Sequence, residues 1–429
     1  MQIRSKFLVP AVFLPLLALP VQADPEPVGM EFQVNTYTPD EEDTPVVAAA
    51  PDGGFVVAWE SYDQDMAFEG IFVRRFDAEG QPLGDEMQAN TNTAGNQEDA
   101  SVAVGDDGSF VVVWDADNAA DGEARGIFGR RFDSSGSPVG DEFGVNVFTT
   151  GDQNDPVVAM MPDGGFVVAW ETELAMDPTD EDLVGLRFDS MGSPVGDEFE
   201  INTTMAFDQE DLAIGTDAVG NFVVVWESYA QDGLFDGIIG RRFDSGGNAL
   251  GDEFVVNTYT IGDQADPALS VAADGSFVVA WEDFDIEGPD EAVMGRFYDS
   301  SGNPAGEAFQ MDVFADGLQR NPSVALTPNG AVAAWQSLDQ DGAGGSVVVR
   351  SFDSDGVPRS DELVVNTTTM GFQGYPWVAQ SEDRFLVVWE DGASADGSLD
   401  GVFGQVFKEG LFADGFESGD TSGWSSVSP

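Results

Sequence analysis

The apolar segment from Phe55 to Trp59 returns six further times along the chain, and each copy ends on a tryptophan. The seven tryptophans are Trp59, Trp114, Trp170, Trp226, Trp281, Trp335 and Trp389. Successive copies lie about 55 residues apart, a period that is typical of propellers and solenoid-like arrays. The chain is therefore expected to fold as a series of similar units that pack on one another.

Each unit carries four short apolar segments, which we expect to be β-strands. In the first unit, three of them are residues 45–48, 55–59 and 71–77, and residues 142–146 of the next unit exemplify the fourth. The second segment is apolar at consecutive positions, so both of its faces should be covered by protein. Turns such as residues 51–54 contain glycine, which supplies the positive φ of a tight hairpin.

The two ends of the repeat array are complementary. Residues 31–35 form a segment of the fourth type with no unit ahead of them, and the last unit lacks its fourth segment. An array that closes on itself can pair these two ends and leave no open sheet edge. The sequence therefore predicts an all-β, seven-bladed β-propeller with four strands per blade. Its ring should be closed by the N-terminal strand pairing with the last blade.

The N-terminus has the pattern of an export signal. Arg4 and Lys6 precede an apolar run over residues 7–20, and Ala23 ends the stretch. This pattern predicts a signal peptide over residues 1–23, since the run is too short and too rich in proline to anchor in a membrane. We expect the propeller over 24–408, followed by a flexible acidic Gly/Ser-rich tail over 409–429. The protein should be secreted, outside the cell or on its surface, with the periplasm as an alternative.

Composition excludes several classes of function. The chain has 79 Asp and Glu against 16 Lys and Arg, for a net charge of −63, and it has no Cys and no His. So acidic a protein repels nucleic acid and attracts cations, although it would also suit life in high salt. Without Cys there are no disulfides, zinc-thiolate sites or thiol catalysis. Without His the commonest general base is missing.

The repeat resembles a known bacterial module. Its unit reads F-V-V-A-W-E, then G-R-R-F-D, then G-D-E-F-x-V-N-T, and it covers residues 29 to 408. It resembles a repeat of large secreted and surface proteins of bacteria, where it serves as a scaffold or adhesive module, often beside calcium-binding repeats. The resemblance implies no assigned chemistry. We expect a monomer whose partner is an extracellular protein or a glycan. The tail is similar to a short ending on many exported bacterial proteins.

One rim of the propeller is expected to be strongly acidic. The loops from the second to the third strand, and from the fourth strand to the next unit, should share this face, and both are rich in acids. Alternating carboxylates beside glycine are typical of calcium loops, although none of these is an EF-hand. Solvated loops without metal are the alternative. The calcium ligands predicted on this rim are Asp63, Asp65, Asp115, Asp117, Asp121, Asp232, Asp236, Asp339 and Asp341.

Arginine is concentrated away from this rim. Residues such as Arg74 and Arg130 recur in the third segment, so we expect them to pair with acids such as Asp85 and Glu86. Only Arg125 and Arg320 fall on the acidic rim. The rim therefore lacks the arginine cluster that a sialidase-like propeller needs to bind a carboxylate.

The seventh unit breaks the repeat pattern with two aromatic residues. Tyr375 and Trp377 stand where other units carry small or aliphatic residues, and together they predict a surface on which a sugar stacks. The alternative is that Trp377 fills a buried seam where the ring closes.

Two functional hypotheses follow. The first is an exported, non-enzymatic binding or adhesive scaffold with an acidic, calcium-binding rim, since no unique acid–base constellation stands out. The alternative is a carbohydrate-active enzyme, a glycosidase or lyase, that uses rim carboxylates and needs no histidine.

Overall fold

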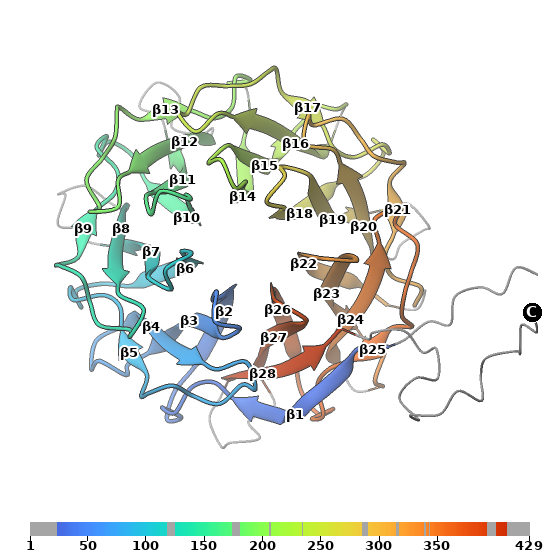
Figure 1. Ribbon diagram of the computed structural model, residues 1–429, viewed down its shortest axis with the longest axis horizontal. Helices are drawn as coiled ribbons and strands as arrows, with labels where there is room; N and C mark the ends of the chain where they lie inside the picture. The colour runs from blue at the N-terminus through green and yellow to red at the C-terminus, as the bar shows by residue number, and fades with distance from the viewer. Residues whose placement is uncertain are drawn as a thin grey trace, which may run out of the picture.

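The structure is a computed structural model. It describes residues 24–117, 125–173, 181–205, 207–233, 235–284, 291–314, 317–338, 340–342, 344–392 and 400–409. These residues form seven four-stranded antiparallel sheets around a central channel (Figure 1). Among them no helix is long and apolar enough to cross a membrane. The predicted signal peptide and all of the tail after Glu409 lie outside the described residues.

In blades 1 to 6 the strands follow chain order from the channel outward, and in blade 7 the N-terminal strand β1 takes the outermost place. Blades 1 and 2 are β2 (Glu42–Ala49), β3 (Phe55–Tyr62), β4 (Glu69–Phe76), β5 (Met87–Gln88), and β6 (Gln97–Val104), β7 (Phe110–Asp117), β8 (Arg125–Phe132), β9 (Phe143–Gly144). Blades 3 and 4 are β10 (Gln153–Met160), β11 (Phe166–Glu173), β12 (Glu181–Phe188), β13 (Phe199–Glu200), and β14 (Gln209–Thr216), β15 (Phe222–Tyr229), β16 (Asp236–Phe243), β17 (Phe254–Val255). Blades 5 and 6 are β18 (Gln264–Val271), β19 (Phe277–Phe284), β20 (Glu291–Tyr298), β21 (Phe309–Gln310), and β22 (Gln319–Thr327), β23 (Gly330–Leu338), β24 (Gly345–Asp353), β25 (Leu363–Val364). Blade 7 is β26 (Gln373–Ser381), β27 (Arg384–Asp391), β28 (Gly401–Lys408) and β1 (Glu26–Gln33).

The predicted closure of the ring is confirmed. Strand β1 pairs antiparallel with β28, from Glu26 opposite Lys408 to Gln33 opposite Phe403. Beyond the strand, the Val34 amide donates to the Val402 carbonyl at 2.8 Å. Figure 1 shows β1 alongside β28 at the outer edge of this blade. The predicted all-β propeller of seven four-stranded blades is therefore correct.

The tryptophan column forms the core between blades. All seven of its indoles are at most 1% exposed, and the apolar residues before them are buried on both faces, as expected from their sequence. Trp59 of blade 1 packs in one cluster with Leu386 and Val388 of blade 7. Removing a ring of this size from such a core costs about 3–5 kcal/mol.

Two polar columns tie the blades together. Gln153 accepts a hydrogen bond from Trp170 Nε1 at 3.0 Å, so the recurring glutamine has a structural role. Asn90, at the end of a fourth segment, donates to the carbonyl of Asn92, as expected of a residue that caps its own backbone. Its Oδ1 also accepts from the amide of Ile71 on β4 at 3.0 Å, which the sequence does not indicate.

The partners expected for the third-segment arginines are wrong. Arg74 donates to the carbonyl of Val34 at 2.8 Å, and its guanidinium lies over the Phe76 ring. Arg130 repeats this arrangement with the Ala89 carbonyl at 3.0 Å. Glu86 instead accepts from the Thr36 amide at 2.7 Å. The arginines are structural, but they join neighbouring blades through backbone carbonyls and lie over aromatic rings of their own strands.

Candidate functional site

A ring of seven residues surrounds the mouth of the channel on the acidic face. Every innermost strand has a β-bulge near its start, where the pairing register with the next strand shifts. One residue of each bulge has a left-handed backbone, with φ between 43° and 53°. These residues, called the mouth ring here, are Thr44, Asp99, Asp155, Asp211, Asp266, Asn321 and Tyr375. All seven line the channel cavity of about 920 Å³.

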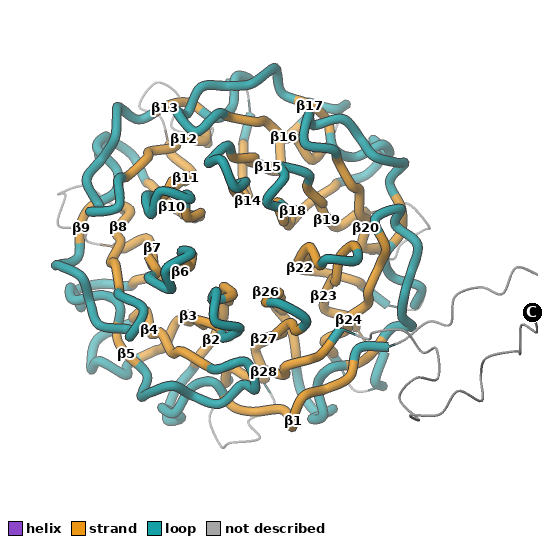
Figure 2. Tube along the Cα trace, in the orientation of Figure 1, coloured by secondary structure: helices purple, strands orange, loops and turns teal. Residues whose placement is uncertain are grey.

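The mouth ring has two unlike sides. Blades 2 to 5 contribute four consecutive aspartates, whereas blades 6, 7 and 1 contribute Asn321, Tyr375 and Thr44. Strand β26, which carries Tyr375 and Trp377, lies across the channel from β14 (Figure 2). An aromatic wall therefore faces an acidic one.

A column of acids at the ends of the second strands supports the ring. It consists of Glu60, Asp115, Glu171, Glu227, Glu282 and Glu390, with Gln336 in blade 6. Glu60 accepts the backbone amide of Asp99 at 2.8 Å, and Glu171 accepts that of Asp211 at 2.7 Å. Each of these carboxylates holds the left-handed residue of the following blade, which explains why an acid is buried at this position.

Burial and mutual repulsion keep protons on this column. Burial raises the pKa of Glu227 to about 9, with further contributions from Asp211 and Asp236. Burial and the neighbouring Asp155 raise the pKa of Glu171 to about 11. Although the Asp211 side chain reaches solvent in the channel, surrounding protein atoms and then Asp266 raise its pKa to about 7. Protonated and ionised carboxyl groups therefore coexist at the mouth at neutral pH.

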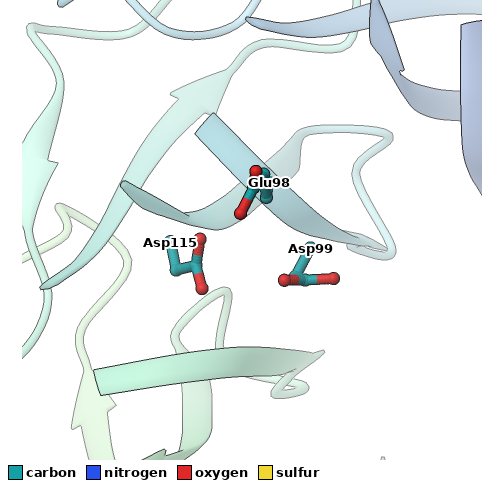
Figure 3. A group of neighbouring side chains, drawn as sticks. All are labelled: Glu98, Asp99 and Asp115. Carbon is teal, nitrogen blue, oxygen red and sulfur yellow. The ribbon is translucent and has the colours of Figure 1, made fainter. Parts of the chain in front are cut away.

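Within the described residues, two groups of three carboxylates converge. The first, in blade 2, consists of Glu98, Asp99 and Asp115, each with an oxygen within 4.8 Å of the others (Figure 3). Arg125, at the start of β8, makes an ion pair with Glu98 and lies 2.8 Å from the fully buried Asp115. It also lies 3.4 Å from Asp117. The positive charge of Arg125 therefore offsets part of the negative charge of this carboxylate group.

The second group, in blade 4, has no such arginine. Glu210, Asp211 and Glu227 again have oxygens within 4.8 Å of one another. Beside them is a cavity of about 190 Å³ whose lining residues are Asp208, Glu210, Glu227, Tyr229 and Asp236. Phe207 and Tyr229, both about half exposed, meet at its edge with ring centroids 5.4 Å apart. Burial, followed by Glu181 and Asp208, raises the pKa of Glu210 to about 7.

The described members of the predicted calcium ligands are spread over blades 1, 2, 4 and 6, and most have protein partners. Asp65 accepts from the Ala67 amide at 3.0 Å and from Gln88 at 2.6 Å, and Asp63 lies in the same turn. Asp115 and Asp117 both contact Arg125.

The other predicted ligands follow the same pattern. Asp232 accepts from Asn257, burial and then Asp263 raise the pKa of Asp236, and Asp341 accepts from Asn366 at 3.5 Å. Asp121 and Asp339 lie outside the described residues. Carboxylate oxygens suit calcium, and among the described predicted ligands Asp115 belongs to a converging group, whereas the others lie outside both groups. Calcium binding stays a prediction.

The two aromatic residues predicted to bind a ligand both line the channel. Tyr375 and Trp377 are each 45% exposed, in contrast to the buried tryptophan column. Trp377 therefore does not fill a closed seam. Tyr375 belongs to the mouth ring and packs against Phe372 with ring centroids 5.8 Å apart.

Sequence reasoning missed the mouth ring and the column of acids. A signal was present, because an acid follows the tryptophan in six units and an Asp lies two residues after a recurring Gln in four. Because these acids repeat around the ring, their pattern is naturally interpreted as structural. The sequence does not reveal the β-bulges that place the mouth ring residues at the channel.

Comparison with known proteins supports the fold. No family model matches the chain, and no curated protein matches it in sequence. A protein of unknown function from Dyadobacter fermentans is 11% identical, with a TM-score of 0.52 over 88% of this chain and 98% of that one. The polysaccharide lyase Uly1 is 9% identical, with a TM-score of 0.50 over 90% and 98%. A Penicillium chrysogenum alpha-L-arabinanase is 13% identical, with a TM-score of 0.49 over 89% and 100%.

Proposed function

We propose that the acidic mouth of the channel binds and cleaves a saccharide, so that the protein is carbohydrate-active. The observation that carries this proposal is that the exposed Tyr375 and Trp377 line the same channel cavity as Asp211, a member of the blade 4 carboxyl group. Aromatic faces stack on sugar rings, and paired carboxyl groups cleave glycosidic bonds. The fold shared with a polysaccharide lyase supports the proposal. The enzyme hypothesis is therefore preferred here to the adhesive scaffold.

The chemistry proposed is glycoside hydrolysis by the blade 4 group. Glu227, with a pKa of about 9, holds a proton at neutral pH and would donate it to the leaving oxygen. Asp211, with a pKa of about 7, faces the channel and would attack the anomeric carbon when ionised. Their spacing within 4.8 Å is closer to the roughly 5–5.5 Å of retaining glycosidases than to the roughly 6.5–9.5 Å of inverting ones.

The charge of the protein restricts the substrate. A net charge of −63 repels uronic and sialic acids, and both rim arginines are already paired with carboxylates. A neutral or cationic saccharide is therefore the expected substrate class.

Glu227→Gln is expected to lower turnover at least about a hundredfold, because it removes the general acid and preserves its shape. The test is a screen of neutral and amino polysaccharides by release of reducing ends. Glu390→Gln is the matched control, since it changes the same column position in blade 7. The products of the wild type should retain anomeric configuration by NMR. Binding without turnover in the wild type would instead establish the non-enzymatic scaffold.

Calcium is a separate proposal for the acidic rim. Ions bound there would offset carboxylate repulsion, and at a hundredfold excess over Kd one site adds about 2.7 kcal/mol of stability. We expect a higher melting temperature in about 5 mM calcium than in sodium chloride of matched ionic strength. An equal rise in both salts would mean screening alone.

A further inference from the structure

We propose that the blade 4 pocket binds a protonated amine, so that the saccharide bound at the mouth is a polymer of amino sugars with free amino groups. The assignment of a sugar rests on the function proposed above. The assignment of a positive charge rests on a separate comparison between blades of this protein.

Blades 2 and 4 can be compared position by position through their strand registers. Glu98 pairs with Asp115 in blade 2 as Glu210 pairs with Glu227 in blade 4. Two residues after Asp115 on β7, Asp117 pairs with Arg125 of β8. The matching pair in blade 4 is Tyr229 with Asp236. The same two carboxylates are therefore present in both blades, but an arginine in one is replaced by an aspartate in the other.

Blade 2 shows what these carboxylates bind. The Arg125 guanidinium contacts both of them, with its Nη1 2.8 Å from Asp115 and its Nη2 paired with Glu98. The other rim arginine also binds a carboxylate, since Arg320 donates to Glu291 across the border of blades 5 and 6, through Nη2 at 2.6 Å. In blade 2, a planar nitrogen cation is therefore the partner of the paired acids.

Among the described residues, blades 3 and 4 supply no such cation. Their arginines are Arg187, Arg241 and Arg242, which donate to the carbonyls of Gly246, Ile201 and Ser300. Asp236 meets Asp263 instead, and that contact, after burial, raises its pKa. The pocket thus concentrates acids without the positive charge found in blade 2.

The shape of the pocket favours an organic cation over a metal ion. Its volume of about 190 Å³ far exceeds the roughly 30 Å³ that one water occupies in the liquid. Tyr229 and Phe207 border it, and aromatic rings attract organic ammonium groups as well as sugar faces. A pyranose ring with a protonated amino group matches both the volume of the pocket and its acidic lining.

The test is calorimetric binding to the full chain at a pH of about 7, where the carboxyl groups of Glu210 and Asp211, with pKa values of about 7, are partly ionised and an amine still carries protons. The probes are a fully deacetylated chitosan hexasaccharide and the N-acetylated hexasaccharide of equal length. We expect the deacetylated probe to bind at least about tenfold more tightly, because only it carries ammonium groups. Asp236→Arg, which places in blade 4 the arginine of blade 2, should abolish that preference. Asp197→Arg makes the same charge change at an exposed turn and should leave the preference intact.

Each alternative outcome has a distinct meaning. Equal affinity for the two hexasaccharides would overturn the amine pocket and leave the saccharide function standing. Hexalysine binding that Asp236→Arg abolishes, with no binding of either sugar, would overturn the saccharide and indicate a basic peptide. Loss of the preference in Asp197→Arg as well as in Asp236→Arg would indicate nonspecific charge attraction and overturn the inference.

Discussion

Deletion of residues 24–36 is expected to lower the melting temperature by at least about 10 °C and to make the protein aggregate. The deletion removes β1, so that β28 becomes an unpaired edge. It also removes Val34, which is fully buried, and Asn35, whose Oδ1 accepts from the Val402 amide at 3.1 Å. Scanning calorimetry and size-exclusion chromatography are the measurements. An equally stable monomer would show that the N-terminal strand does not close the ring.

Two single substitutions on β1 test the contribution of its side-chain packing without deleting the strand. Phe32 lies against Phe76, with ring centroids 5.3 Å apart, whereas Met30 on the same strand is 86% exposed. Phe32→Ala is expected to cost about 2–4 kcal/mol of unfolding free energy, and Met30→Ala nothing measurable. Equal effects of the two would contradict the packing of β1.

The free energy of unfolding is expected to fall as the pH rises from about 5 to about 9. Carboxylates in ion pairs have the opposite effect, because their lowered pKa makes stability rise with pH. Glu171 and Glu282 titrate near their ordinary pKa when unfolded, but folding raises their pKa to about 11 and about 9. In that interval the folded protein binds more protons than the unfolded one. The stability from these groups is therefore full below the unfolded pKa and is lost as the pH rises through the folded pKa. Denaturant unfolding at several pH values measures this slope.

Glu171→Gln is the variant that isolates one such group. Blade 6 already has Gln336 at this position, so the fold accepts the amide. The variant should gain about 2–4 kcal/mol at a pH of about 8 and nothing at a pH of about 4, because it folds without taking up a proton. Glu200→Gln on β13, at an exposed position, is the control and should change neither value. A loss of stability at both pH values would mean that Glu171 is ionised in the folded protein.

The fold could be predicted because its determinants are local and repeated. The tryptophan column, the glycine turns and the complementary ends at residues 31–35 and in the last unit specify blade number and closure. The partners of Arg74 could not be predicted, because a carbonyl acceptor such as that of Val34 leaves no mark in the sequence.

The candidate site was only partly predictable. Tyr375 and Trp377 could be singled out because they differ from the residues at the same positions of other units. Asp211 and Glu227 could not, because most other units also carry acids at those positions. Their chemistry depends on burial and on bulges that bring carboxyl groups from two strands within 4.8 Å. The sequence gives the face on which acids lie, but not which of them converge.

Trp377 offers the most direct measurement of whether the channel mouth is the saccharide site. The seven indoles of the repeat column are at most 1% exposed, whereas that of Trp377 is 45% exposed. Tryptophan emission is recorded while cellohexaose, arabinohexaose and the deacetylated chitosan hexasaccharide are titrated into the wild type and Trp377→Ala. A ligand that stacks there should change the emission of the wild type, and Trp377→Ala should lose the change and bind at least about tenfold more weakly. The same spectral change and affinity in both proteins would place the sugar elsewhere and contradict the proposed site.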